Sequence, residues 1–386
     1  MVDDLIVAPQ RYQSETNMLR TMGFPGQYLQ GPKALLELGP LLRKMGFQRP
    51  LTLCDAIVGE KVWPLASGSM KAAGLEATHI VFPGECTRSA INALSEQAKA
   101  AAPDVIIGLG GGKTIDSAKG ISLSLDVPVV ICPTIASNDA PTSRLIVLYD
   151  ETHRVAGVEY LKCNPAAVVV DTEIIAQAPA RFFAAGIGDT VSKKFEAAQC
   201  KAANGNNSFG TPPLDTALLL ANAAYETLIK HGPTAYRSIA NGQLDDEVER
   251  VVEGTVLLSG VGFESGGLSL AHALIRGLTA VPTMASMLHG ELVAFGTLVQ
   301  LMVEERDDVE VAELLELLCA VNLPVTFAQL GQAATLNAEE MSTIVSATLA
   351  AAYSKNMNPP LTAGRLERAL VKADATGASA LQKRKW

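Results

Sequence analysis

The stretch GLGGGKTIDSAKG, residues 108–120, decides the fold, although it matches neither of the two common phosphate-loop patterns. The pattern GxxxxGK[ST] needs a glycine five residues before Gly112, and Ile107 occupies that position. The pattern GxGxxG begins correctly at Gly108 and Gly110, but Lys113 stands in place of the last glycine. Both standard interpretations therefore fail.

The local physics of this stretch still favours a phosphate site. An apolar run at 105–107 leads into four glycines within five residues, and helical spacing follows over 114–124. A strand, a glycine turn and a helix N-terminus expose backbone N–H groups and the positive end of a helix dipole, which suits a pyrophosphate. The alternative is an ordinary tight turn in an α/β protein.

Length and composition predict a globular protein of about two domains. The chain has 386 residues, of which 48% are hydrophobic and 18% charged, with a mean hydropathy of +0.22. The net charge of −9 and a pI near 5.2 argue against a broad surface for nucleic acid or anionic membranes. Basic residues form no long cluster apart from the terminal Lys383-Arg384-Lys385. We therefore expect no nucleic-acid or membrane partner.

Cysteine usage and the N-terminus indicate the compartment. The six cysteines include no CxxC pair, so we expect buried thiols rather than a zinc knuckle or a disulfide framework. The opening MVDDLIVAPQRYQ is acidic, and no apolar run approaches the roughly 20 residues of a membrane span. These features predict a reduced, cytoplasmic protein.

The distribution of apolar runs predicts two domains of different class. In the first half, helical stretches alternate with short apolar runs, typical of buried parallel strands, at 51–54, 77–82, 105–109, 127–131 and 167–170. Long Ala/Leu/Glu segments then replace them, for example at 214–229, 293–303 and 309–321. We predict an α/β Rossmann-like domain over 1–178, with an N-terminal extension at 1–25, and an all-α domain over 179–386.

Three histidines stand in the helical half. His231 precedes Gly232 and is interpreted as a structural residue at a helix C-terminus. His272 and His289 lie in apolar helical segments separated by a break at Pro282. One histidine in an apolar helix is more often a core residue than a ligand, but two on neighbouring helices suggest a metal site.

An aspartate completes this candidate metal site. Asp189 follows two glycines in AAGIGDTVSKKFEA, where it could simply be the N-cap of a helix. As a ligand it would join the imidazoles of His272 and His289 and leave one coordination position open. An open position is typical of catalytic rather than structural zinc.

Polar residues also follow two of the expected strands. The segment CPTIASNDAPTSRLIVLYDE, residues 132–151, places Asp139 and several hydroxyl groups at the carboxyl end of a strand, where open α/β sheets bind ligands. A polar connecting loop is the alternative. Asp55 follows another strand, where an acid can bind the ribose hydroxyls of NAD, although a turn aspartate explains it equally well.

Five sequence blocks together resemble the glycerol dehydrogenases of the iron-containing, or group III, alcohol dehydrogenase superfamily. The resemblance runs from about Gly26 to near the C-terminus, with the blocks in the family order and spacing. The blocks are GGGKTIDSAKG, PTIASNDAPTS, VVVDTEIIAQAPARFFAAGIGD, LSGVGFESGGLSLAHA and HGELVAFGTLVQL. The family fold combines a Rossmann-like NAD domain with a helical metal domain in a dehydroquinate-synthase-like architecture.

The resemblance also implies roles for individual residues. Zinc, or iron or manganese in its place, would be bound by Asp189, His272 and His289, and these residues with Asp139 would form the catalytic and substrate-binding set. The residues implied in NAD binding are Asp55, Gly110, Gly111, Gly112, Lys113, Thr114, Asp116, Thr134, Ser137, Ser143, Leu145 and Tyr149. The implied reaction is oxidation of glycerol or a related vicinal diol by hydride transfer to NAD from an alkoxide that the metal stabilises. Homo-oligomers, often octamers, are implied as the assembly.

Two departures from the family keep other functions open. Family members commonly have His-Asn three and four residues after the first histidine ligand, whereas this chain has Ile275-Arg276, and Asn138 stands where threonine is usual. Arg276 could favour an acidic substrate if it faced the pocket, so an NAD-dependent hydroxycarboxylate or other diol dehydrogenase is an alternative. A dehydroquinate-synthase-like lyase and a non-catalytic nucleotide-binding protein are further alternatives.

Overall fold

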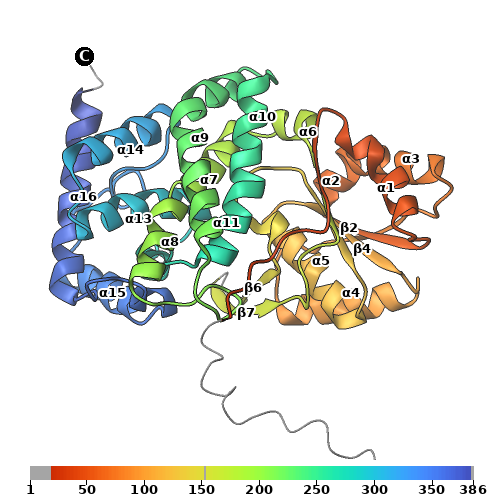
Figure 1. The fold of residues 1–386 in the computed structure, drawn as a ribbon, viewed down its shortest axis with the longest axis horizontal. Helices are drawn as coiled ribbons and strands as arrows, with labels where there is room; N and C mark the ends of the chain where they lie inside the picture. Colours follow the sequence, from red (N-terminus) through yellow and green to blue (C-terminus); the bar gives the residue numbers. More distant parts are fainter. Residues whose placement is uncertain (1–18, 152–153, 384–386) are drawn as a thin grey trace, which may run out of the picture.

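The computed structural model describes residues 19–151 and 154–383. Most of the expected N-terminal extension therefore lies outside the described residues. An α/β region and a helical region lie side by side, from right to left in Figure 1, as expected for this fold class. The described end of the extension contacts the helical region, because Thr21 N–H donates to Thr211 Oγ1 and Gly23 N–H to Ser265 Oγ.

The α/β region is built on one parallel sheet. Its six strands lie in the order β1-β8-β5-β4-β2-β3, and every pairing is parallel. The four inner strands are buried along their whole length, as their continuous apolar sequences predict. The strands are β1 (Tyr28–Gly31), β2 (Pro50–Cys54), β3 (Thr78–Val81), β4 (Val105–Gly110), β5 (Val129–Pro133) and β8 (Ala167–Asp171).

Alternate side chains of β4 enter two different cores. Val105 and Ile107 pack in a cluster with Leu38 of α1 (Leu38–Lys44) and Met70 of α3 (Trp63–Ala72). Ile106 points the other way, into the cluster that contains residues of α4 (Arg88–Lys99) and α5 (Gly112–Leu125). The sheet is therefore covered by helices on both faces, which is the arrangement that period-two alternation in a parallel strand requires.

The strand order reverses between β2 and β4. From β2 the chain moves outward to β3, and from β4 it moves in the opposite direction through β5 to β8. In open α/β sheets ligands bind in the crevice outside the carboxyl ends of the strands at such a reversal. Asp55 and Gly111 directly follow β2 and β4, so both lie at this edge.

Two strand features were not predicted. The edge strand β1 has the sequence YLQG, which contains no apolar run. An antiparallel hairpin of β6 (Leu145–Tyr149) and β7 (Val155–Tyr160) forms a second small sheet within and beyond the segment that we expected to be a polar loop. The hairpin packs against α5, since Ile146 and Leu148 belong to the same core as Ile115.

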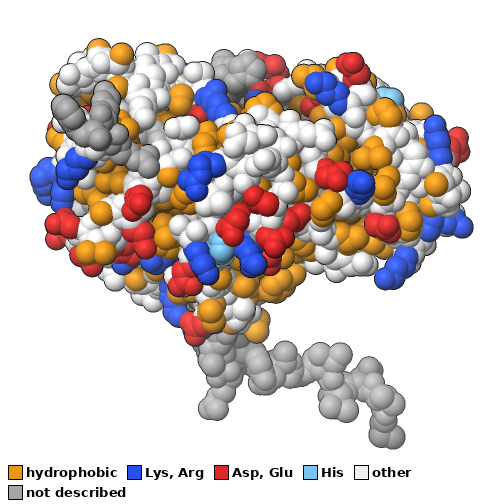
Figure 2. Space-filling model, turned by 90° about the horizontal axis from the view of Figure 1, so that it is seen from above, with side chains coloured by type: hydrophobic (Ala, Val, Ile, Leu, Met, Phe, Trp, Pro, Cys, Tyr) orange, Lys and Arg blue, Asp and Glu red, His pale blue; other side chains and the backbone are white. Residues whose placement is uncertain are grey.

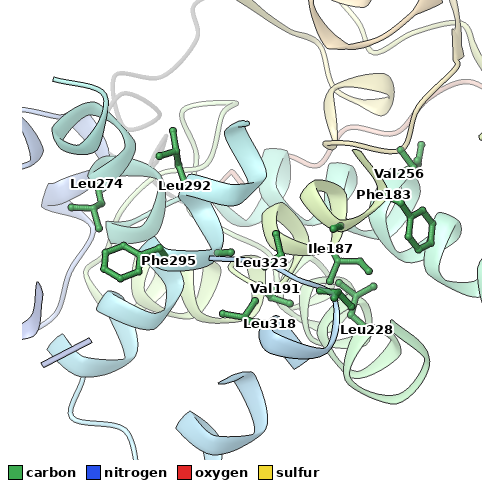
Figure 3. Packing of buried hydrophobic residues seen from close by; sticks show 14 of the residues in the cluster. Phe183, Ile187, Val191, Leu228, Val256, Leu274, Leu292, Phe295, Leu318 and Leu323 are labelled. Atoms are coloured by element: carbon green, nitrogen blue, oxygen red, sulfur yellow. The ribbon is translucent and has the colours of Figure 1, made fainter. Parts of the chain in front are cut away.

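The helical region begins after β8, and its buried apolar residues form one continuous cluster with those on one face of the sheet. In Figure 3, Ile187 and Val191, at the end of α7, lie between Leu228 of α9 and Leu323, with Phe295 of α13 farther along. The helices are α6 (Thr172–Ala176), α7 (Ala180–Thr190), α8 (Lys193–Ala202), α9 (Asp215–Ala240), α10 (Asp246–Val252), α11 (Ser259–Gly266), α12 (Leu270–Leu278), α13 (His289–Val303), α14 (Asp308–Ala320), α15 (Ala338–Leu349) and α16 (Ala363–Lys383).

The interpretation of His231 as a helix C-terminal residue is wrong. Helix α9 continues through His231 and Pro233 to Ala240. Gly232 does not end the helix. It faces α14, and a Cβ added to it would lie 2.9 Å from Leu317 Cδ1. His231 is structural all the same, since its Nδ1 lies 2.5 Å from Glu247 Oε2.

The expectation of buried cysteine thiols is confirmed only in part. Five cysteines are buried free thiols, but Cys163 is exposed, because it lies in the turn that follows the hairpin. Figure 2 shows acidic and basic side chains interspersed on the face that it presents. Among the described helices, none combines the length and the apolar character that crossing a membrane would need.

Candidate functional site

Two glycines bring α7 and α13 close enough to share a site. A Cβ on Gly290 would lie 1.7 Å from the carbonyl oxygen of Ala185, and a Cβ on Gly188 would lie 2.3 Å from the carbonyl oxygen of Gly290. Any larger residue would therefore meet backbone rather than a side chain that can move. This close approach sets Asp189 of α7 beside His289, the first residue of α13.

The three predicted metal ligands meet at this point. Asp189 Oδ1 lies 3.3 Å from His272 Nε2 and 3.6 Å from His289 Nε2, and the two imidazole rings are 5.3 Å apart. The distances of 3.3 and 3.6 Å are close to the spacing of about 3.4 Å between ligand atoms that each lie about 2.1 Å from one tetrahedral ion. The expected N-cap alternative for Asp189 is wrong, because Asp189 lies in the last turn of α7.

The chemistry of the cluster fits a divalent cation. The Asp189 side chain is fully buried, and its Oδ2 has no hydrogen-bond partner among the described residues. A buried carboxylate oxygen without a partner is costly, and a cation would satisfy it. Burial raises the pKa of Asp189, but Lys193, His272 and His289 outweigh burial and hold it well below its usual value. The His289 side chain is 43% exposed, which leaves the cluster accessible from solvent.

Glu196 of α8 orients the first histidine. Its Oε2 lies 2.6 Å from His272 Nδ1, and its Oε1 accepts the backbone N–H groups of His272 and Ser269. With Nδ1 donating to Glu196, Nε2 is the nitrogen directed at Asp189 and available to a metal. Burial lowers the pKa of His272, but Glu196 and Asp189 more than offset this and raise it to about 9. The sequence alone gave no signal for Glu196.

Replacing Glu196 by glutamine is expected to weaken zinc binding by about 10- to 100-fold. The glutamine Nε2 would donate to His272 Nδ1 and move the imidazole proton to Nε2, the atom that the metal needs. Competition with a chromophoric chelator measures the affinity. Glu313→Gln, on α14 at the Tyr225 hydroxyl, is the matched control. An affinity equal to that of the wild type would show that Glu196 does not set the tautomer.

Asp139 reaches the metal-ligand cluster from the α/β region. It follows β5, is buried, and accepts a hydrogen bond from Ser259 Oγ of α11 at 3.1 Å. Its Oδ2 lies 3.0 Å from Lys193 Nζ, which is in turn 2.6 Å from Asp189 Oδ1. Burial and the neighbouring Asp189 raise the pKa of Asp139. Lys193 thus links the predicted substrate residue to the predicted metal ligand, and the sequence analysis missed it.

The glycine loop lies at the crevice in the sheet. Gly111 is the N-cap of the 14-residue α5 and offers no capping side chain, and the first turn of α5 contains no acidic residue. The backbone N–H groups at this helix start are therefore free to bind an anion. Lys113 turns toward β6, with its Nζ 2.6 Å from Glu85 Oε2 and 4.9 Å from the centre of the Tyr149 ring.

Asp116 and Lys119 hold the polar loop in place. Asp116 Oδ2 accepts the N–H of Val147, and its Oδ1 lies 3.2 Å from Lys119 Nζ. Lys119 is fully buried and donates to the carbonyl oxygens of Ala140 and Leu145. Burial raises the pKa of Asp116. The Asp116 carboxylate thus positions the hairpin strand β6 on α5.

The remaining predicted cofactor residues are distributed around the crevice. Asp55 caps α2 (Ala56–Lys61) by accepting the N–H of Val58 at 2.9 Å, so the turn explanation accounts for one of its oxygens. Ser137 and Tyr149 are half-buried. The buried members of the set are Thr114, Thr134, Ser143 and Leu145.

Comparison with known proteins agrees with the fold. Residues 25–172 match the family model described as "Iron-containing alcohol dehydrogenase". A glycerol dehydrogenase of Escherichia coli is 39% identical over 95% of this chain and 99% of its own, and one of Pseudomonas putida is 42% identical over 81% and 86%. The crystal structure of glycerol dehydrogenase from Schizosaccharomyces pombe superposes with a TM-score of 0.89 at 32% identity, covering 95% of this chain and 94% of that one.

Relatives of this identity and coverage, together with the matched family model and the shared fold, establish the family. The candidate metal cluster is formed by Asp189, His272 and His289, whose ligand atoms all lie within 4.8 Å of one another. The chain is a dehydrogenase similar to glycerol dehydrogenases, and it belongs to the iron-containing alcohol dehydrogenase family.

Proposed function

We propose that this protein oxidises glycerol and related vicinal diols, glycerol to dihydroxyacetone, with NAD as hydride acceptor and zinc as the bound metal. The observation that carries the proposal is the buried Asp189 carboxylate, whose unpartnered Oδ2 and neighbouring imidazoles form a donor set for a divalent cation. Its relatives named glycerol dehydrogenases support the choice of substrate.

For the cofactor, we propose that the pyrophosphate of NAD binds at Gly110, Gly111, Gly112, Lys113 and Thr114. The capless N-terminus of α5 at the sheet crevice supports this placement. Asp55 would bind the adenine ribose, and Thr134, Ser137, Ser143, Leu145 and Tyr149 would line the rest of the site. Asp116 would contribute to this site indirectly, because its carboxylate accepts the N–H of Val147 and so holds strand β6 in place.

In the proposed mechanism the chain's own residues hold the metal, orient its ligands and bind the substrate. Asp189, His272 and His289 would hold zinc, which when bound acts as a Lewis acid that lowers the pKa of an alcohol. Glu196 accepts the hydrogen bond of His272 Nδ1, so Nε2 is the nitrogen that would bind zinc. Asp139, from the α/β region, would bind a substrate hydroxyl. The two regions together would place the carbon that gives up hydride against the nicotinamide, whose redox chemistry belongs to the cofactor.

We propose that the two regions are separate domains divided after residue 178, the first for NAD and the second for the metal. The short connection at 177–179, between α6 and α7, supports the boundary. Contacts across it are direct, since Thr142 Oγ1 donates to the carbonyl oxygen of Val256, and the N–H of Arg144 donates to Glu264 Oε1. The octameric assembly suggested by the family stays a prediction.

Removing the metal tests the proposal. The purified protein is stripped with a chelator and refilled with zinc, and NAD reduction is followed with glycerol, 1,2-propanediol, 2-hydroxy acids or no substrate. We expect turnover to fall at least about 100-fold on stripping and to return with zinc, because a Lewis acid contributes several kcal/mol to such a step. NADH binding, measured by fluorescence, should persist in the stripped protein as the control.

Other outcomes of the same experiment select other functions. Turnover with hydroxy acids alone would favour a hydroxycarboxylate dehydrogenase, for which Arg276 is the available cation, since it is exposed one turn after His272. Full activity without metal would contradict the proposed role of zinc. NAD binding without net reduction on any substrate would favour the lyase or the non-catalytic alternative.

A further inference from the structure

Lys193 places an ammonium group inside the metal-ligand cluster. The residue begins α8, its side chain is fully buried, and its Nζ lies 2.6 Å from Asp189 Oδ1 and 3.2 Å from His272 Nε2. Both of these atoms belong to the group that could hold a metal ion. We propose that Lys193 is a tethered cation that competes with the metal for Asp189 and His272.

The competition follows from the distances. An ion bound to Asp189 would lie about 2.1 Å from a carboxylate oxygen, whereas Lys193 Nζ lies 2.6 Å from Oδ1 of the same carboxylate. Two positive charges held this close in a buried site repel each other strongly, because little water screens them. Because Lys193 Nζ lies 2.6 Å from Asp189 Oδ1 and 3.2 Å from His272 Nε2, a metal bound between these two atoms requires the ammonium to leave that position.

Asp139 gives the displaced ammonium an alternative partner. Its Oδ2 already lies 3.0 Å from Lys193 Nζ, and it belongs to the loop after β5 rather than to the helical region. Without a metal, Lys193 neutralises two buried carboxylates that would otherwise face each other, which is costly in a protein interior. With a metal on Asp189, Lys193 keeps Asp139 as its partner. The site can thus exchange one cation for the other without leaving a buried carboxylate unpaired.

The next residue provides a matched control. Lys194 has the same charge, but its Nζ lies 3.0 Å from Glu310 Oε1 and 4.3 Å from the centre of the Tyr225 ring. Substituting Lys194 changes the net charge by the same amount without removing a group from the metal-ligand cluster. A difference in zinc affinity between variants at the two positions would therefore result from the place of Lys193 in the cluster and not from its charge alone.

The test is the zinc affinity of the metal-free full-length protein, measured by competition with a chromophoric chelator at one fixed pH. We expect Lys193→Met to bind zinc at least about tenfold more tightly than the wild type, because the ammonium repulsion is removed. Lys193→Gln, which keeps a hydrogen-bond donor for Asp189, should behave in the same way and serves if the methionine variant does not fold. Lys194→Met should bind within about threefold of the wild type.

The outcomes separate this inference from the proposed function, on whose metal site it rests. A wild type that binds zinc, with Lys193 variants that gain less than tenfold or bind more weakly, would overturn the competition and leave the metal site intact. An equal gain in Lys194→Met would also overturn it, since net charge alone would then suffice. Failure of every variant and of the wild type to bind zinc would overturn the metal site and the competition together.

Discussion

Replacing Asp189 by asparagine is expected to lower kcat/KM for glycerol about a thousandfold, which corresponds to ~4 kcal/mol of transition-state stabilisation. Asp189 is the one carboxylate in the cluster and lies within 3.6 Å of both imidazoles. The amide has no negative charge, so it would neither balance a divalent cation nor hold Lys193 and His272 beside each other.

Steady-state kinetics with added zinc, together with the zinc affinity, measure this effect. Asp215→Asn is the matched control, because Asp215 is an exposed carboxylate that pairs with Lys201 far from the cluster. It should keep wild-type kinetics. Circular dichroism establishes that both variants are folded. An Asp189→Asn protein that retained a tenth of the activity at saturating substrate would remove Asp189 from the proposed ligand set.

Replacing Gly290 by alanine is expected to destabilise the protein by at least ~3 kcal/mol, because the added methyl overlaps backbone that cannot turn away. Its Cβ would lie 1.7 Å from the carbonyl oxygen of Ala185, so α13 would have to separate from α7. The separation would also move His289 away from Asp189. Zinc affinity should therefore fall together with the free energy of unfolding.

Urea denaturation and chelator competition measure the two effects of this variant. Gly68→Ala in α3 is the matched control, because a Cβ added there meets no atom within 4 Å. In an exposed helix, alanine in place of glycine should stabilise by about 0.5–1 kcal/mol. If Gly290→Ala unfolded at the same urea concentration as the wild type, the close approach of α7 and α13 would not be a steric requirement.

Local sequence patterns were sufficient for the sheet and for the glycine loop. The continuous apolar runs at β4 and β5 predicted buried parallel strands, because such strands need no polar face. The four glycines from the end of β4 to the start of α5 predicted an anion-binding turn for the same kind of local reason. Where a strand has no such pattern, as in β1 with its sequence YLQG, only pairing with β8 defines it.

The candidate metal ligands could be predicted as residue types, but their neighbours could not. His272 and His289 were distinguished as imidazoles on two apolar segments, Asp189 was added as the carboxylate that could complete the set, and the family resemblance pointed to the same three residues. Glu196 and Lys193 gave no signal, because a charged residue in an amphipathic sequence looks the same whether it is buried or exposed. Their burial depends on the packing of α8 against α9 and α11, and on the contact of Glu196 with His272 of α12, far away in the sequence.

The sequence by itself therefore determined the α/β sheet, the glycine turn before α5, the family and the residue types of the candidate metal cluster, since each depends on neighbours within a few positions or on recurring blocks. The tertiary structure alone decided three other features: the end position of Asp189 in α7, the fixed orientation of His272 by Glu196, and the ammonium of Lys193 between two carboxylates. These features bring together side chains from separate helices and from both regions. Only the packing of the whole chain, with glycines where backbones touch, fixes distances of a few ångströms between such residues.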